Sequence, residues 1–207
     1  MLASMFVPIT GPFLARRMTR LLFGLVLFGG GTGLIIQSEL GNPPWDVLHE
    51  GLSNLFDGAW STVGTWSIIV AFVVLLGWIP LRERLGIGTV LNAIIIGLMM
   101  NVVSLYVEKG SGLIERSALM VGGTLLVGVG SGFYIGARLG PGPRDGLMTG
   151  IARRGPAIWK TRTVIEALAL LVGWMLGGTF GVGTVFFVMT IGPLVHFFLR
   201  WLTVPEA

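Results

Sequence analysis

Leu40-Gly41-Asn42-Pro43-Pro44-Trp45-Asp46-Val47-Leu48-His49-Glu50-Gly51-Leu52 is a stretch that the chain carries in two related copies. The second copy begins 99 residues later and reads Leu139-Gly140-Pro141-Gly142-Pro143-Arg144-Asp145-Gly146-Leu147-Met148-Thr149-Gly150-Ile151. Leu-Gly, the second Pro, the Asp and the later Gly hold the same places in both copies. Each copy separates two strongly apolar segments with a turn and the start of a short helix.

The composition around these copies indicates a protein that is solvated by lipid. Apolar residues make up 53% of the 207 residues, charged residues only 12%, and the mean hydropathy is +0.84. A soluble domain carries about 25% charged residues. The 33 glycines lie mostly in apolar runs, where transmembrane helices use Gly for close packing. The absence of Cys excludes disulfides, thiolate metal sites and cysteine nucleophiles. We therefore expect an all-α membrane protein.

Six segments are long and apolar enough to cross a hydrocarbon core, which needs roughly 20 helical residues. They are residues 19–38, 62–80, 87–107, 118–138, 161–179 and 183–203. The first resembles a signal peptide because Arg16, Arg17 and Arg20 surround its start, but no small-residue cleavage site follows it. The sequence thus predicts six transmembrane helices.

The basic residues predict how these helices are oriented. With six spans, 12 of the 14 Lys and Arg residues fall on the side of the two termini, and only Lys109 and Arg116 fall on the other side. Basic loops stay in the cytoplasm, so both termini are predicted to be cytoplasmic. Because the basic residues lie between apolar spans, the net charge of +4 does not indicate binding of nucleic acid.

The similarity between the copies extends through most of the chain. Four glycines of the first span recur in the fourth at the same spacing, Gly77-Trp78 recurs as Gly173-Trp174, and Gly86-Ile87-Gly88-Thr89-Val90 recurs as Gly181-Val182-Gly183-Thr184-Val185. Each repeat holds three spans, so the second must enter the membrane in the opposite direction, as in many transporters. The predicted organisation is a cytoplasmic segment 1–17, a first repeat 18–107, an external linker 108–116, an inverted second repeat 117–203 and a cytoplasmic tail 204–207.

The two Pro-Asp elements are the first candidates for a functional site. Asn42 is a suitable N-cap, with Pro43 or Pro44 in the first turn of a short amphipathic or re-entrant helix. One interpretation is that Asp46 and Asp145 only complement the helix dipole. A second is that the two helix starts approach each other from opposite faces and line a substrate path together with Arg144. A third is that the helix is an interfacial anchor.

Polar side chains inside the spans extend this candidate site. Glu166 lies within the fifth span, where an ionisable group is a functional candidate, or it pairs with Arg162 one turn earlier. His196 and Asn101 occupy equivalent positions in the sixth and third spans, either lining the path or forming interhelical hydrogen bonds. Metal ligands in a suitable cluster, phosphate-binding loops and catalytic triads are absent from the sequence. We therefore expect neither an enzyme nor a cofactor or metal.

Two small-x3-small pairs, Gly29 with Gly33 and Gly128 with Gly132, are candidates for helix packing. We expect them to bring the first and fourth helices together, and a homodimer interface is the alternative.

The repeated Leu-Gly-x-x-Pro-x-Asp element, the Gly-rich first helix and Gly86-Ile87-Gly88-Thr89-Val90 resemble the bacterial YczE/YyaS/YitT family of small integral membrane proteins, and the YczE branch in particular. The resemblance covers about residues 18–200. It implies a place in the bacterial cytoplasmic membrane, and it brings no substrate and no site residues with it.

These observations predict a transporter or channel-like protein that moves a small solute or ion through a site between two inverted repeats. The alternative is a membrane assembly or regulatory subunit that acts through its basic cytoplasmic loop, residues 138–162. Asp46, Asp145, Arg144, Glu166, His196 and Asn101 are the candidate path-lining residues. We expect the lipid bilayer and a small solute or ion as partners.

Overall fold

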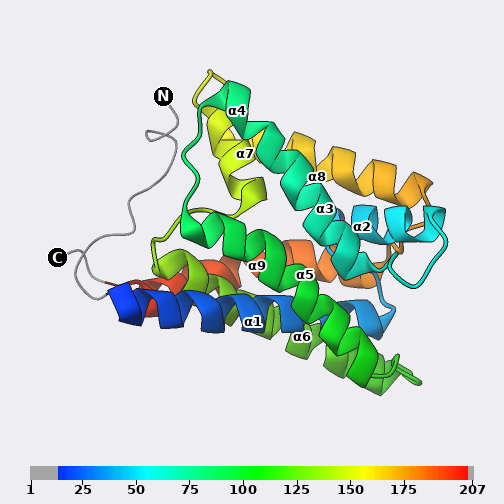
Figure 1. Cartoon of the computed structure of the whole chain (residues 1–207). Coiled ribbons are helices and arrows are strands. Elements are labelled where there is room, and N and C mark those ends of the chain that lie inside the picture. The colour runs from blue at the N-terminus through cyan, green and yellow to red at the C-terminus, as the bar shows by residue number, and fades with distance from the viewer. Residues whose placement is uncertain (1–13, 205–207) are drawn as a thin grey trace.

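The computed structural model describes residues 14–204, and its regular elements are helices (Figure 1). In chain order these are α1 (Leu14–Ser38), α2 (Pro44–Leu55), α3 (Val63–Leu76), α4 (Trp78–Leu81), α5 (Ile87–Tyr106), α6 (Leu113–Gly136), α7 (Pro143–Ala152), α8 (Ile158–Met175) and α9 (Val182–Leu202). The prediction of an all-α membrane protein is confirmed. Most of the predicted segments 1–17 and 204–207 lie outside the described residues.

Five helical segments have the length and apolar character of membrane spans: α1, the α3–α4 unit, α5, α6 and α9. They correspond closely to five of the predicted spans. The remaining predicted span, 161–179, corresponds to α8, which begins earlier and carries Lys160, Arg162 and Glu166 within its 18 residues. These charges separate α8 from the other five, so the count of six spans stays a prediction.

Helices α1 and α6 pack against each other along a seam of glycines. A methyl group at Gly31 would lie 2.5 Å from the Gly123 carbonyl oxygen, and one at Gly24 would lie 2.7 Å from that of Gly130. The two helices run antiparallel, because the earlier glycine of α1, Gly24, meets the later glycine of α6, Gly130. Gly24 and Gly31 are the repeat counterparts of Gly123 and Gly130, so each helix presents the same pair of glycines to the other.

The small-x3-small glycines have different partners from those expected. Gly29 and Gly33 face Met99, Val103 and the backbone at Ile96 on α5. Gly128 and Gly132 face Leu194 and Phe198 on α9. The expectation that these four residues join the first and fourth helices is therefore corrected. They hold α5 on α1 and α9 on α6, while the seam between α1 and α6 uses the other glycines.

The loops after α1 and α6 bind the opposite repeat in matched ways. The Gly183 N–H donates to the Leu40 carbonyl over 2.7 Å, and the Gly88 N–H donates to the Leu139 carbonyl over 2.9 Å. The following residues, Gly41 and Gly140, have φ angles of +117° and +125°. Each loop therefore docks on the helix start of the other repeat, at α9 or at α5.

Charged contacts show which loops lie together at each end of the helices. Glu39 pairs with Lys109 at 2.6 Å and with Arg116 at 2.9 Å, which joins the first and third loops. Glu83 pairs with Arg153 at 2.9 Å, which joins the second and fourth loops at the other end. In Figure 1 the loop after α2 and the loop after α7 accordingly lie at opposite ends of the helical bundle.

Candidate functional site

Helices α2 and α7 place their first turns inside the protein. In both, a proline occupies the first helical position, where a backbone N–H would have no partner within the helix. The Asp follows two positions later. Pro43 and Gly142 are the N-cap residues. The expected cap Asn42 instead donates from its side chain to Glu50 over 2.8 Å, and its N–H donates to the Thr179 carbonyl.

A cavity of about 350 Å³ lies where these two helix starts meet. The first repeat contributes Pro43, Pro44, Trp45 and Asp46, and the second contributes Gly142, Pro143, Arg144 and Asp145. Side chains of α1, α3, α5, α6, α8 and α9 complete the wall, and most of them are apolar. A volume of this size is typical of small-molecule sites, which measure about 300–1,000 Å³.

Asp46 is the centre of a buried polar cluster. The residue is 3% exposed, and its Oδ1 lies 3.0 Å from His49 Nδ1 and 3.8 Å from an Arg144 nitrogen. The Arg144 guanidinium also lies over the Trp45 ring, 5.0 Å from its centroid, where a cation–π attraction holds it. Arg144 therefore connects the second repeat to the acidic group of the first.

Asp145, the counterpart of Asp46, has a different environment. The residue is exposed where it lines the cavity, and its Oδ2 accepts a hydrogen bond of 2.8 Å from the Tyr134 hydroxyl of α6. Among residues 14–204 no basic side chain forms an ion pair with it. The two aspartates thus share a cavity, but only Asp46 has a guanidinium beside it.

Two further candidates reach the same cavity. Glu166 lines it from α8, and its carboxylate accepts from Arg162 over 2.9 Å, the pairing that the sequence offers as an alternative role. Arg162 also lines the cavity, so the ion pair and the cavity-lining position coexist. His196 lines the cavity from α9.

Asn101 is the candidate that the structure does not bring to the cavity. Its side chain accepts from Thr62 over 2.8 Å and contacts Thr65 near the start of α3, beside Gly64. Asn101 therefore joins α5 to α3 as an interhelical hydrogen-bonding residue.

The sequence reasoning did not select Tyr134, Ser131 or Thr32, all of which line the cavity. A signal for Tyr134 was available: the chain has only two tyrosines, and this one lies within an apolar span where its hydroxyl requires a partner. Ser131 and Thr32 gave no such signal, because hydroxyl residues in spans commonly bond their own helix, as Thr32 does with Phe28.

Two buried side-chain nitrogens on α2 lack a hydrogen-bond partner among the described residues. They are the Trp45 Nε1–H at the cavity wall and the Nε2 position of His49 behind it. Residues 14–204 contain no group of three His, Asp or Glu side chains arranged to hold a metal ion. The groups that the described residues present at the site are paired charges, a phenol and aromatic faces.

Comparison with known proteins assigns the family. Residues 15–200 match the family described as "Family of unknown function (DUF6198)". An uncharacterized protein of Haemophilus influenzae is 42% identical over 183 residues, covering 87% of this chain and 82% of its own. The uncharacterized membrane protein YczE of Bacillus subtilis is 33% identical over 190 residues, with 90% and 86% covered.

YyaS, also an uncharacterized protein of Bacillus subtilis, is 28% identical over 184 residues, covering 85% of this chain and 89% of its own. No solved structure matches the chain. The extent of these matches confirms the resemblance that the repeated Pro-Asp element predicts. The chain therefore belongs to the family of unknown function DUF6198 and is related to the membrane protein YczE and to YyaS.

Proposed function

We propose that this protein transports a small solute or ion across the bacterial cytoplasmic membrane, through a site between two inverted repeats. The observation that carries the proposal is the meeting of the α2 and α7 helix starts at one cavity, where Arg144 of the second repeat lies 3.8 Å from Asp46 of the first. Broken or short helices whose N-termini meet near the bilayer midplane are the usual substrate sites of inverted-repeat transporters.

The proposal includes α8 as the sixth span. The charges that separate it from the other spans lie in its first half, near the basic loop, and Glu166 and Arg162 turn to the cavity. Ionisable groups inside a membrane are tolerated where they pair and line a polar cavity. Six spans put both termini in the cytoplasm and give the two repeats opposite directions.

The matched contacts between the repeats support the inversion. The antiparallel α1–α6 seam uses equivalent glycines from each side, and each Leu-Gly loop docks on the other repeat. Such reciprocal contacts are expected of two similar units related by a two-fold axis in the membrane plane.

The alternative, a regulatory subunit acting through its basic loop, receives less support from the structure. Arg153 pairs with Glu83, Arg154 donates to the Pro80 carbonyl over 2.6 Å, and Arg162 pairs with Glu166. Much of the positive charge in residues 138–162 thus binds the protein itself, and less of it remains for a partner.

Water access to the cavity from each side of the membrane tests the proposal. The chain has no Cys, so single cysteines can be introduced without removing native ones. Asn92 lines the cavity from α5, and Asn92→Cys should react with a charged, membrane-impermeant thiol reagent in both right-side-out and inside-out vesicles. Alternating access exposes one site to each side in turn.

Gly122→Cys is the matched control, because this position on α6 has open space around it and does not line the cavity. Its thiol faces lipid and should remain unmodified in both vesicle types. When Asp46→Asn and Asp145→Asn are added to Asn92→Cys, the ratio of the thiol reaction rates in right-side-out and inside-out vesicles should change. Reaction from one side only, or from neither, would refute transport through this cavity.

A further inference from the structure

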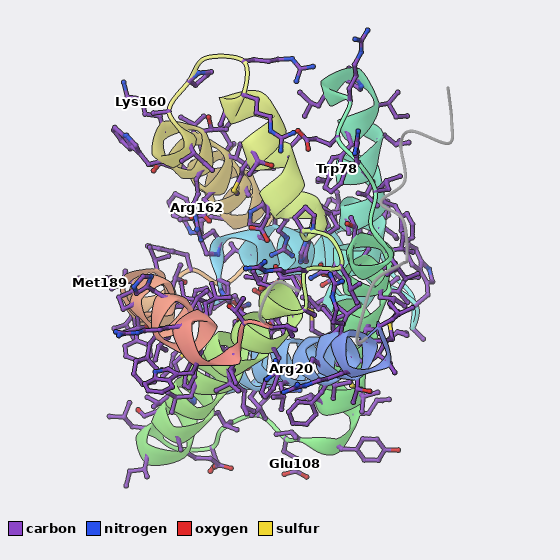
Figure 2. All side chains as sticks on the ribbon, turned by 90° about the vertical axis from the view of Figure 1, so that its left-hand side faces the viewer. Arg20, Trp78, Glu108, Lys160, Arg162 and Met189 are labelled. Atoms are coloured by element: carbon purple, nitrogen blue, oxygen red, sulfur yellow. The ribbon has the colours of Figure 1, made fainter. Side chains whose placement is uncertain are left out.

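The two repeats differ in how tightly one pair of helices packs. In the first repeat α3 lies along α5. In the second, α8 makes little contact with α9, although these are the corresponding helices. Figure 2, seen from the left-hand side of Figure 1, places α8 and α9 on the same flank of the protein, with Arg162 on the side of α8 that faces α9.

The cavity reaches this gap between α8 and α9. Arg162 and Glu166 line it from α8, and Ile191, Gly192 and His196 line it from α9. Gly192 is exposed, and a methyl group there would meet no atom within 4 Å. The cavity therefore opens sideways between two helices whose outer faces carry exposed apolar side chains, such as Leu168 and Met189. In a membrane that opening faces lipid.

The charges around the cavity leave one carboxylate in excess. Arg144 lies near Asp46, and Arg162 forms an ion pair with Glu166. Among the described side chains, Asp145 accepts a hydrogen bond only from the Tyr134 hydroxyl. A carboxylate away from bulk water is stabilised by a positive charge nearby. Asp145 is also exposed, so a ligand in the cavity can reach it.

We propose that the substrate is a hydrophobic cation that enters from the bilayer between α8 and α9 and places its charge beside Asp145. The inference rests on the proposed function and names the substrate class of the same cavity. The sideways opening selects a molecule that partitions into lipid. The excess carboxylate selects a positive charge, and the largely apolar wall accommodates the rest of the molecule.

Binding of matched probes to the purified full chain in detergent tests this inference. Tetraphenylphosphonium and tetraphenylborate have the same shape and opposite charge, and tetramethylammonium has the positive charge without the apolar bulk. By equilibrium dialysis, tetraphenylphosphonium should bind at least about tenfold more tightly than either, because only it matches both the charge and the apolar wall. Equal binding of the phosphonium and the borate would overturn the assignment of charge.

Two substitutions locate the binding. Gly192→Phe fills the open space at the mouth and should abolish binding, while Gly122→Phe fills equally open space on α6 away from the cavity and should leave it unchanged. Asp145→Asn keeps an acceptor for Tyr134 and removes the charge, and it should weaken phosphonium binding about tenfold or more. Full binding by Gly192→Phe would overturn the entry route, and full binding by Asp145→Asn would overturn the role of that carboxylate.

The thiol-access experiment separates this inference from the proposed function. If Asn92→Cys reacts from both sides but the phosphonium does not bind, the protein transports another class of solute and the inference is wrong. If the phosphonium binds with the expected dependence on Gly192 and Asp145 but access is one-sided, the substrate class holds as a binding specificity and transport is refuted.

Discussion

Gly41 and Gly140 combine a left-handed backbone with close contact between the repeats. Gly41 has a φ of +117°, and a methyl group there would lie 2.5 Å from the Gly181 nitrogen and 2.7 Å from Thr184 Oγ1. At the equivalent Gly140, a methyl group would lie 2.8 Å from Thr89 Oγ1. A side chain at either position would meet both backbone strain and occupied space. This explains why both copies of the repeated element carry Gly at this place.

Gly41→Ala should therefore lower the unfolding temperature in detergent more than Gly155→Ala does. Gly155 has a similar φ of +127° but open space around it, so its substitution incurs only backbone strain of about 1–3 kcal/mol. Overpacking adds a further 1–3 kcal/mol or so at Gly41. Thermal unfolding of the two variants measures the difference, and equal shifts would show that the docking contact is not tight.

Glu39 should make stability depend on pH at the end of the protein that holds the first and third loops. The hydrogen bond and charge of Lys109, with Arg116 nearby, lower the pKa of Glu39 below its usual value. A lowered pKa in the folded state contributes stability above the unfolded value of about 4.5, and that contribution is lost as the pH falls through the folded pKa.

The wild type should accordingly be more stable than Glu39→Gln at pH 7, by less than about 1 kcal/mol because the pair is largely exposed. The difference in unfolding temperature should shrink as the pH falls below 4 and as salt is added. A difference that stays constant with pH would assign the effect of the substitution to something other than charge.

At the scale of helices, neighbouring glycines on α6 should respond in opposite ways. Gly123 faces α1, where a methyl group would lie 2.5 Å from the Gly31 carbonyl oxygen, whereas Gly122 meets no atom within 4 Å. Gly123→Ala should destabilise the protein by about 1–3 kcal/mol through overpacking. Gly122→Ala should be neutral or slightly stabilising, because Ala favours the helix. Thermal unfolding distinguishes them, and similar losses would place the seam elsewhere.

The helices themselves were predictable because apolar length is a strong signal in membranes. The five spans that the structure supports were all among those predicted, with ends shifted by up to five residues. The partners of individual glycines were not predictable. Gly24, Gly29, Gly31 and Gly33 all lie on one helix, and only the crossing geometry determines that Gly24 and Gly31 face α6 while the other two face α5.

The same limit applies to the site. Asp46 and Asp145 were selected because the sequence repeats them in an unusual Pro-Asp context, and the structure places both at the cavity. Tyr134 belongs to no repeated motif, and the distance between His49 and Asp46 depends on the local helix. The sparse contact between α8 and α9 has no counterpart in the sequence pattern, because it is a property of how whole helices are placed.

At the scale of the whole molecule, Asp57 and Pro156 provide the sharpest test of inversion. They are equivalent residues, 99 positions apart, in the loops that follow α2 and α7, and both are exposed. Inverted repeats place these loops on opposite sides of the membrane, whereas parallel repeats place them on the same side. In intact cells a membrane-impermeant maleimide should label Asp57→Cys. It should label Pro156→Cys only after the membrane is permeabilised.

Gly112→Cys and Arg84→Cys extend this test to the remaining loops. The contact of Glu39 with Lys109 and Arg116 joins the first and third loops, so Gly112→Cys should be labelled together with Asp57→Cys. The Glu83–Arg153 pair joins the second and fourth loops, so Arg84→Cys should be protected together with Pro156→Cys. Three spans, the α3–α4 unit, α5 and α6, lie between Asp57 and Pro156. Labelling of Asp57→Cys and Pro156→Cys from the same side would require an even number of spans between them. Helix α8 follows both residues, so that result would remove the two-fold relation between the repeats whether or not α8 crosses the membrane.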